Sequence, residues 1–81
     1  MTKEEIILKA NEVLADEFEV DVDTLTPDAP LKETLDLDSL DLVDVVVLIE
    51  KNFGVTLTAP DFIDVKTFED FYTMLEKKVN E

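Results

Sequence analysis

Carboxylates interrupt the most apolar segment of the chain at short intervals. In the stretch TLDLDSLDLVDVVVLIEKNFGV, residues 34–55, four aspartates stand among almost unbroken Leu, Val and Ile: Asp36, Asp38, Asp41 and Asp44. The β-branched run Val45–Val47 would by itself suit a strand. However, residues 38–52 contain neither Gly nor Pro and are too many for an ordinary strand. The pattern therefore predicts a helix over residues 38–52.

The ends of this predicted helix carry residues that start and stop helices. Asp38 and Ser39 are both good N-caps, and Asp41 adds negative charge to the first turn, where the helix dipole favours it. Gly54 follows as a C-terminal stop signal. The single hydroxyl of this region, Ser39, thus falls at the expected start of the helix.

Two further segments repeat apolar residues at helical spacing. Residues 2–16 open with the capping-box pattern of Thr2 and Glu5. Their apolar residues recur at helical intervals or lie just beyond: Ile6, Ala10, Val13, Leu14 and Phe18. The last helix is expected to begin after Thr67, and its apolar residues form an amphipathic stripe: Phe68, Phe71, Tyr72, Leu75 and Val79.

The connections between these segments complete the predicted architecture. Residues 19–37 read as a long, partly packed loop, in which Pro27 and Pro30 prevent a continuous helix. A short helical turn is expected near Pro60, because proline suits the first helical position. We therefore predict an all-α fold: a small antiparallel bundle of three main helices plus one short helix, with a long first loop. At 81 residues, we expect residues 1–81 to form one domain.

The 38–52 helix is predicted to have two different faces. At about 100° per residue, one side is apolar and should enter the core: Leu42, Val46, Ile49 and Phe53, with Val43 and Val45 at its flanks. The other side mixes charge with aliphatics: Asp41, Asp44 and Lys51 with Leu40, Val47 and Leu48. One interpretation is a helix buried nearly all round. A docking surface is favoured instead, because the two aspartates could not be buried there without partners.

Composition and charge exclude several classes of function. The chain has no Cys and no His, which excludes disulfides, thiolate sites and the commonest general base. Twenty-one acidic residues against seven Lys or Arg give a net charge of −14, which disfavours nucleic acid and anionic membranes and favours basic partners. The apolar runs are too short to span a membrane, and the N-terminus lacks signal-peptide features. We expect a cytoplasmic monomer without stable membrane insertion.

Three roles compete for Ser39 at this point. A hydrolytic nucleophile is excluded, since the chain has neither His nor a G-x-S-x-G elbow. A plain N-cap is credible. The third role is a site of covalent modification, because a helix N-terminus favours a phosphate group and the flanking Asp38 and Asp41 would recruit a basic modifying enzyme.

The motif Asp38-Ser39-Leu40-Asp41, followed by an acidic and aliphatic helix that ends EKNFGV, resembles the acyl carrier protein family. The resemblance runs over essentially the whole chain and includes the proline-containing loop, the short helix, and Val65-Lys66-Thr67-Phe68 before the last helix. It implies a non-catalytic carrier in which Ser39 bears 4′-phosphopantetheine, transferred from coenzyme A by a phosphopantetheinyl transferase. No catalytic residue and no metal ligand are expected in the chain itself. The added thiol explains thioester chemistry in a protein without Cys.

The resemblance also assigns residues to partner binding. Acyl-transferring, condensing and reducing enzymes with basic patches are expected to meet one set of side chains: Asp38, Leu40, Asp41, Asp44, Val47, Glu50 and Val65. A bound acyl chain would be lined by a second, apolar set: Val43, Val46, Ile49, Phe53, Leu57 and Leu75. These residues are equally explained as ordinary core.

Departures from the family pattern leave the cargo open. Asp36 and Leu37 stand where the family often has Gly and a small residue, and Lys51 stands where an acid is frequent. Fatty-acid, polyketide and specialised lipid pathways are all compatible with the sequence, whereas a peptidyl or D-alanyl carrier is less well matched. An unmodified acidic interaction module is a further alternative. An EF-hand beginning at Asp21 is disfavoured, because the fifth, sixth and twelfth loop positions lack the required residues.

Overall fold

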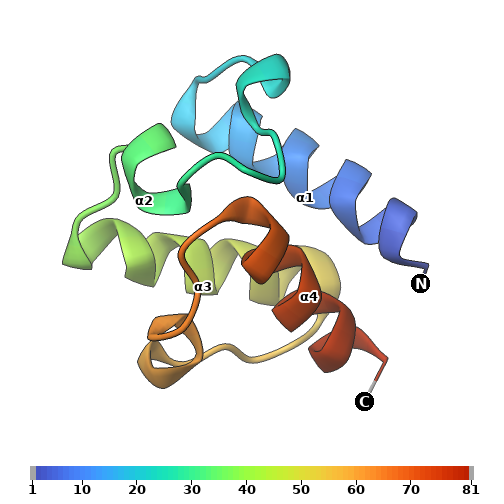
Figure 1. Ribbon diagram of the computed structural model, residues 1–81. Coiled ribbons are helices and arrows are strands. Elements are labelled where there is room, and N and C mark those ends of the chain that lie inside the picture. Colours follow the sequence, from blue (N-terminus) through green and yellow to red (C-terminus); the bar gives the residue numbers. More distant parts are fainter. Residues whose placement is uncertain (1, 81) are drawn as a thin grey trace.

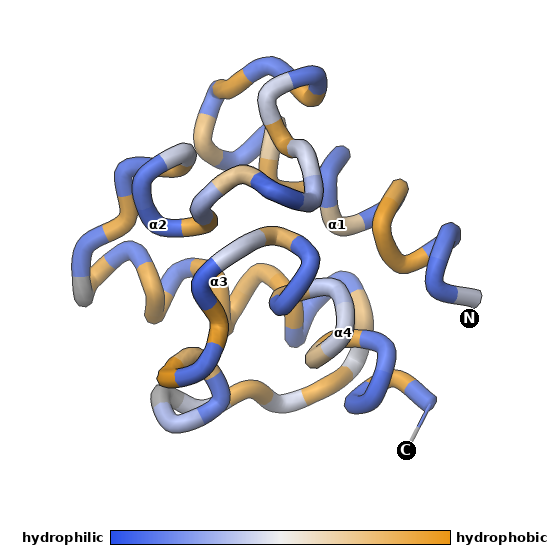
Figure 2. Tube along the Cα trace, in the orientation of Figure 1, coloured by the Kyte–Doolittle hydropathy of each residue, from blue (hydrophilic) through white to orange (hydrophobic). Residues whose placement is uncertain are grey.

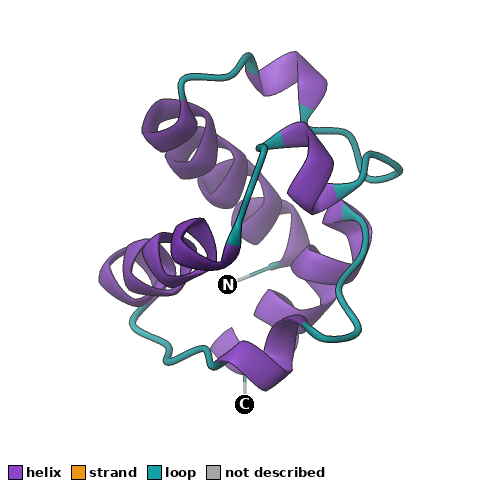
Figure 3. Ribbon diagram, turned by 90° about the vertical axis from the view of Figure 1, so that its left-hand side faces the viewer, coloured by secondary structure: helices purple, strands orange, loops and turns teal. Residues whose placement is uncertain are grey.

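Helices, turns and loops make up the computed structural model, which describes residues 2–80 and, within them, all side chains except those of Ser39 and Ala59. The described elements are α1 (Lys3–Phe18), η1 (Val22–Thr24), α2 (Leu31–Thr34), α3 (Ser39–Phe53), η2 (Ala59–Phe62) and α4 (Phe68–Val79), where η denotes a 3-10 helix. Figure 3 draws the described chain as helices and loops. Strand-like pairing within residues 2–80 is limited to one isolated bridge between Pro30 and Thr67. The predicted all-α class is confirmed.

The three long helices form the predicted bundle. In Figure 1, α1 runs away from the side of the molecule where both chain ends lie, and α3 and α4 run back toward it. The start of α3 therefore lies at the opposite end from the termini. Apolar and polar residues alternate along each helix, so that each can turn an apolar side inward (Figure 2).

Capping boxes start α1 and α4 where the sequence predicts them. The Thr2 Oγ1 atom accepts the Glu5 N–H at 3.2 Å, and the Glu5 carboxylate accepts the Thr2 N–H at 2.9 Å. At α4, Thr67 Oγ1 accepts the Asp70 N–H at 3.3 Å, while Asp70 Oδ2 accepts the N–H groups of Lys66 at 3.1 Å and Thr67 at 3.3 Å. These backbone donors stabilise the ionised carboxylates and lower the pKa values of Glu5 and Asp70.

The connection over residues 19–37 contains more structure than the sequence predicts. Two short helices, η1 and α2, lie within it. The Leu31 N–H donates to the Lys66 carbonyl at 2.9 Å, and the Phe68 N–H donates to the Ala29 carbonyl at 3.1 Å. These tertiary bonds hold the loop against the start of α4, a long-range contact that local sequence does not reveal.

The core contains a buried hydrogen bond that joins distant parts of the chain. The Tyr72 side chain is fully buried, and its hydroxyl donates to Asn11 Oδ1 of α1 and lies 3.5 Å from the Leu25 carbonyl oxygen. Burial raises the pKa of the Tyr72 hydroxyl, because the phenolate would be poorly solvated. Phe68 and Phe71 pack beside it, so α4 supplies the aromatic centre of the bundle.

No helix within residues 2–80 is long and apolar enough to cross a membrane.

Candidate functional site

The start of α3 is built by two carboxylates that cap it reciprocally. Asp38 has extended backbone, and its Oδ1 atom accepts the N–H groups of Leu40 and Asp41, each at 2.9 Å. In return, Asp41 Oδ2 accepts the Asp38 N–H at 3.2 Å. Of the two N-caps that the sequence offers, the structure uses Asp38, and Ser39 becomes the first residue of the helix. Capping therefore does not require the serine, whose side chain lies outside the described residues.

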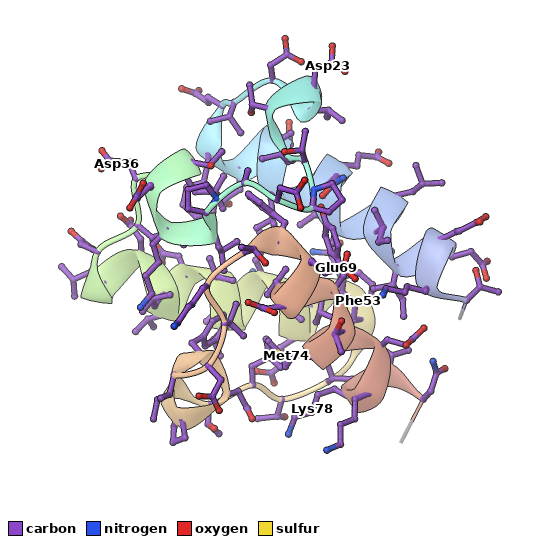
Figure 4. All side chains as sticks on the ribbon, in the orientation of Figure 1. Asp23, Asp36, Phe53, Glu69, Met74 and Lys78 are labelled. Atoms are coloured by element: carbon purple, nitrogen blue, oxygen red, sulfur yellow. The ribbon has the colours of Figure 1, made fainter. Side chains whose placement is uncertain are left out.

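A tight turn connects α2 to the start of α3. The Leu37 N–H donates to the Lys32 carbonyl at 2.8 Å, and Asp36 adopts the left-handed conformation with φ of 52°. Asp and Asn are among the few residues other than Gly that adopt this conformation readily. Position 36, where the family often has Gly, thus keeps the conformation that Gly favours. Figure 4 shows Asp36 pointing outward at this end of the molecule.

The exposed face of α3 combines aliphatic and charged side chains. Leu40 is 76% exposed and Val47 is 45% exposed, although both are apolar. The described side chains that form this face are Leu40, Val43, Asp44, Val47, Glu50 and Lys51. Asp41 is half-buried at its edge, and Asp38 is exposed just before the helix. An apolar surface with acidic neighbours matches the docking character expected from the sequence.

The helix is rotated relative to the predicted face. Val45 is fully buried together with Ile49, whereas the sequence places Val45 only at the flank of the core. Since residues two apart on a helix point to nearly opposite sides, burial of Val45 turns Val43 outward, and Val43 is 58% exposed. In the same rotation Leu48, expected on the outer face, becomes half-buried against the core. Val43 therefore does not line the interior in this conformation.

The resemblance assigns Val65 to partner contact, but the structure places its side chain in the core in this conformation. Val65 is only 6% exposed, because the turn after η2 places Phe62 and Val65 together in the core. The exposed aliphatic residue near η2 is instead Ile63, at 75%. The sequence signal for it is the apolar spacing of Phe62 and Val65, which leaves Ile63 on the outer side of the turn.

The remaining predicted lining residues lie together in the interior. Ile49, Leu57 and Leu75 are buried members of the core, and Val46 and Phe53 pack against it while half-buried. The Lys9 ammonium lies 5.2 Å from the centroid of the Phe53 ring and covers it from α1. The structure thus brings five of the six predicted lining residues to one apolar region beneath α3.

Comparison with known proteins gives the same class as the motif. The sequence profile of the phosphopantetheine attachment site family matches residues 11–75. An acyl carrier protein of Petrotoga mobilis is 40% identical over 80 residues, which cover 99% of this chain and 94% of that protein. An acyl carrier protein of Thermotoga maritima is 36% identical over 78 residues, covering 96% of each chain. A third relative, the polyketide-8 synthase acyl carrier protein 2 of Streptomyces avermitilis, is 33% identical over 86% of this chain and 80% of that protein.

The chain belongs to the phosphopantetheine-dependent acyl carrier protein family. Its function is to carry acyl intermediates on a phosphopantetheine group. Proteins of this family are carriers rather than catalysts, and they work with biosynthetic enzymes and a phosphopantetheinyl transferase. The helix start fits such an attachment, because Asp38 supplies the cap and the neighbours of Ser39 that are described, Asp38 and Leu40, are both exposed.

Proposed function

We propose that Ser39 is the attachment point, and that this carrier presents its thioester arm from the start of α3 to enzymes of fatty-acid, polyketide or specialised lipid synthesis in the cytoplasm. The capping arrangement is the observation that carries the proposal. Because Asp38 accepts both the Leu40 and Asp41 N–H groups, Ser39, the first residue of α3, is not needed as a cap. Residues 1–81 would act as one carrier domain, itself the substrate of its partner enzymes.

Intact mass tests the attachment. Incubation with coenzyme A, Mg²⁺ and a phosphopantetheinyl transferase should add one prosthetic group to the wild-type chain and none to Ser39→Ala. Thr58→Ala is a matched control, because it also removes a hydroxyl near a helix start, but at η2 rather than at α3. A Ser39→Ala chain that still gains the group would place the attachment elsewhere. A wild-type chain that several competent transferases leave unmodified would contradict the carrier function.

We also propose that the exposed face of α3, with Asp38 and Asp41 at its start, receives the basic patches of partner enzymes. Leu40 and Val47 would make the central apolar contacts, and Asp38, Asp41, Asp44 and Glu50 would pair with Lys and Arg. Individually weak contacts suit a carrier that must bind and leave several enzymes, because exposed charges contribute mainly to association rate.

Reversal of one charge tests this docking role. Asp44→Lys should slow modification by the transferase by about three- to tenfold at low ionic strength, since an electrostatically steered encounter is weakened. Asp44 is preferable to Asp41 for this purpose, because Asp41 also accepts the Asp38 N–H and its reversal would disturb the helix start. Asp23→Lys, on η1, makes the same change of charge away from α3 and should leave the rate near that of the wild type. Equal rates for the two variants would exclude the proposed face.

The interior residues Val46, Ile49, Phe53, Leu57 and Leu75 remain our proposed lining for a bound acyl chain. Their burial in one apolar region supports this, and an aliphatic chain would be sheltered there from water. Val43 is not included, because it is exposed.

A further inference from the structure

A groove with an excess of positive charge lies between α2 and the segment that follows η2. Its volume is about 420 Å³, and it is lined by Pro30, Lys32, Glu33, Ile63, Val65 and Lys66. Two of the seven basic residues of the chain and only one acid contribute to it, although the net charge of the protein is −14. The local charge is therefore opposite in sign to that of the whole molecule.

Two backbone hydrogen bonds connect the segments that line this groove to each other and to the turn before Ser39. The Leu31 N–H donates to the Lys66 carbonyl at 2.9 Å, so α2 and the segment before α4 are in direct contact. The Leu37 N–H donates to the Lys32 carbonyl at 2.8 Å. Ser39 follows Leu37 by two residues, a span of at most about 7 Å of chain. The backbone of Lys32 is thus bonded to the turn that leads into α3, and the backbone of Lys66 is bonded to the first residue of α2.

The ammonium groups of the groove form no ion pair with the described residues, although Lys66 is near enough to Asp70 to help lower the pKa of that carboxyl. The ion pairs among the described residues join Lys3 to Glu69 and Lys78 to Asp61, and neither involves Lys32 or Lys66. Ile63 is largely exposed beside the buried Val65. Two ammonium groups next to an exposed aliphatic side chain suit a ligand in which an anion adjoins a small apolar group.

We propose that this groove holds the phosphate end of the arm attached to Ser39, with Lys32 and Lys66 pairing with the phosphodiester. This inference rests on the proposed attachment at Ser39. In 4′-phosphopantetheine a dimethyl-substituted carbon lies next to the phosphate-bearing carbon, and Ile63 is the matching apolar contact. Attachment adds an anion among Asp36, Asp38 and Asp41, and the lysines offset that repulsion, whereas Glu33 opposes it.

The expected effect is modest, and the tether makes it measurable. Exposed ion pairs are individually weak, but covalent attachment keeps the phosphate near the lysines at a high effective concentration. Lys32 and Lys66 should therefore be shielded from small reagents in the holo form and accessible in the apo form.

Lysine acetylation measures this shielding directly. Apo and holo protein are treated with an acetylating N-hydroxysuccinimide ester, and the rate at each lysine is read by peptide mass. Lys32 and Lys66 should react about two- to fivefold more slowly in the holo protein. Lys77, in the last turn of α4, is the internal control and should react equally in both forms. Equal rates at Lys32 in fully loaded and apo protein would overturn the proposal.

Variants separate the groove from simple charge effects. In loaded protein, Lys32→Ala and Lys66→Ala should each shift the ³¹P resonance of the phosphodiester and reduce its dependence on salt, while Lys32→Arg and Lys77→Ala should resemble the wild type. An identical ³¹P resonance in all four variants would contradict the proposed pairing.

Inorganic phosphate distinguishes a tethered ligand from a free one. Added to apo protein at the protein concentration, it should leave the acetylation rates unchanged, because it lacks the tether. Protection equal to that of holo protein would instead make the groove a site for free anions and overturn the assignment to the arm. Loading is verified first by mass, so failure to load counts against the proposed function and failure to protect counts only against the groove.

Discussion

Asp38 both starts α3 and determines where Ser39 lies. Its carboxylate accepts two N–H groups of the first turn, and its own N–H is accepted by Asp41. Because these bonds fix the backbone on either side of Ser39, the orientation of the first helical residue depends on its neighbour. The acid before the serine is therefore a structural requirement as well as a candidate contact for partner enzymes.

Replacement of Asp38 should affect stability and loading together. Asp38→Ala is expected to lower the free energy of unfolding by about 1 kcal/mol, as for other lost N-caps. It should also slow modification of Ser39. Asp38→Asn should retain most of the stability, because Asn caps nearly as well. Urea denaturation followed by circular dichroism measures the first effect. An alanine variant that unfolds at the wild-type midpoint would show that the cap contributes nothing.

At the scale of elements, sequence patterns predict both ends of α1 and α3 to within two residues, and they predict the start of α4. The strongest signals are the Thr2 and Thr67 caps, the aspartate before Ser39, and Gly54, which adopts a left-handed φ of 71°. These signals act through adjacent backbone groups, so they can be read locally. Local signals place Ser39 at a helix start, whereas its role as the candidate attachment residue comes from the resemblance of the motif to acyl carrier proteins.

Features that depend on tertiary contact could not be predicted in the same way. α2 is held by the bond between Leu31 and Lys66, which are distant in sequence. The rotation of α3 that buries Val45 and exposes Val43 is set by packing against the other helices. A prediction from the angle of about 100° per residue treats each apolar residue equally. Val65 was assigned to partner contact by the family resemblance alone, and its burial depends on packing of the turn after η2. The cationic groove was also missed, since its two lysines come from different segments.

The cap of α4 should make stability depend on pH. Because the N–H groups of Lys66 and Thr67 lower the pKa of Asp70, its ionised form stabilises the folded state above the unfolded pKa of about 3.9. This contribution is lost as the pH falls through the lower, folded-state pKa. The difference in unfolding free energy between wild type and Asp70→Asn should therefore be largest above about pH 5 and shrink below about pH 4. Urea denaturation across this range measures it, and a difference independent of pH would exclude the linkage.

For the whole molecule, charge opposes folding. Twenty-one acidic residues outnumber seven basic ones, and most of the acids are exposed. The sum of the interactions between charges is therefore repulsive. Only two ion pairs join described residues, which leaves most of this repulsion unrelieved within that part of the chain.

Added salt should therefore raise the melting temperature of the apo protein. Between about 10 and about 200 mM monovalent salt, screening shortens the range of the repulsion. A rise of about 4–8 °C would correspond to about 1 kcal/mol for a domain of this size. Thermal circular dichroism in sodium chloride, with choline chloride at equal ionic strength as the control for cation binding, measures it. A melting temperature that falls with both salts would show that attraction between charges dominates.

The helices are not joined to the bundle in the same way. α4 makes directional contacts with several segments: the Phe68 and Glu69 N–H groups donate to the 27–29 loop, and the Tyr72 hydroxyl donates to Asn11. By contrast, the described side chains of α3 form hydrogen bonds only within or next to that helix, and the helix is held by apolar packing and the Lys9–Phe53 contact.

Apolar packing tolerates sliding, whereas a hydrogen bond is lost within a small displacement. We therefore expect α4, the 27–29 loop and α1 to keep their relative positions, and α3 to shift more easily against them. A shift of α3, from whose start we propose that the arm extends, would then change the internal volume without breaking a directional bond between α1, α4 and the 27–29 loop. One element would thus present the cargo outside and make room for it inside.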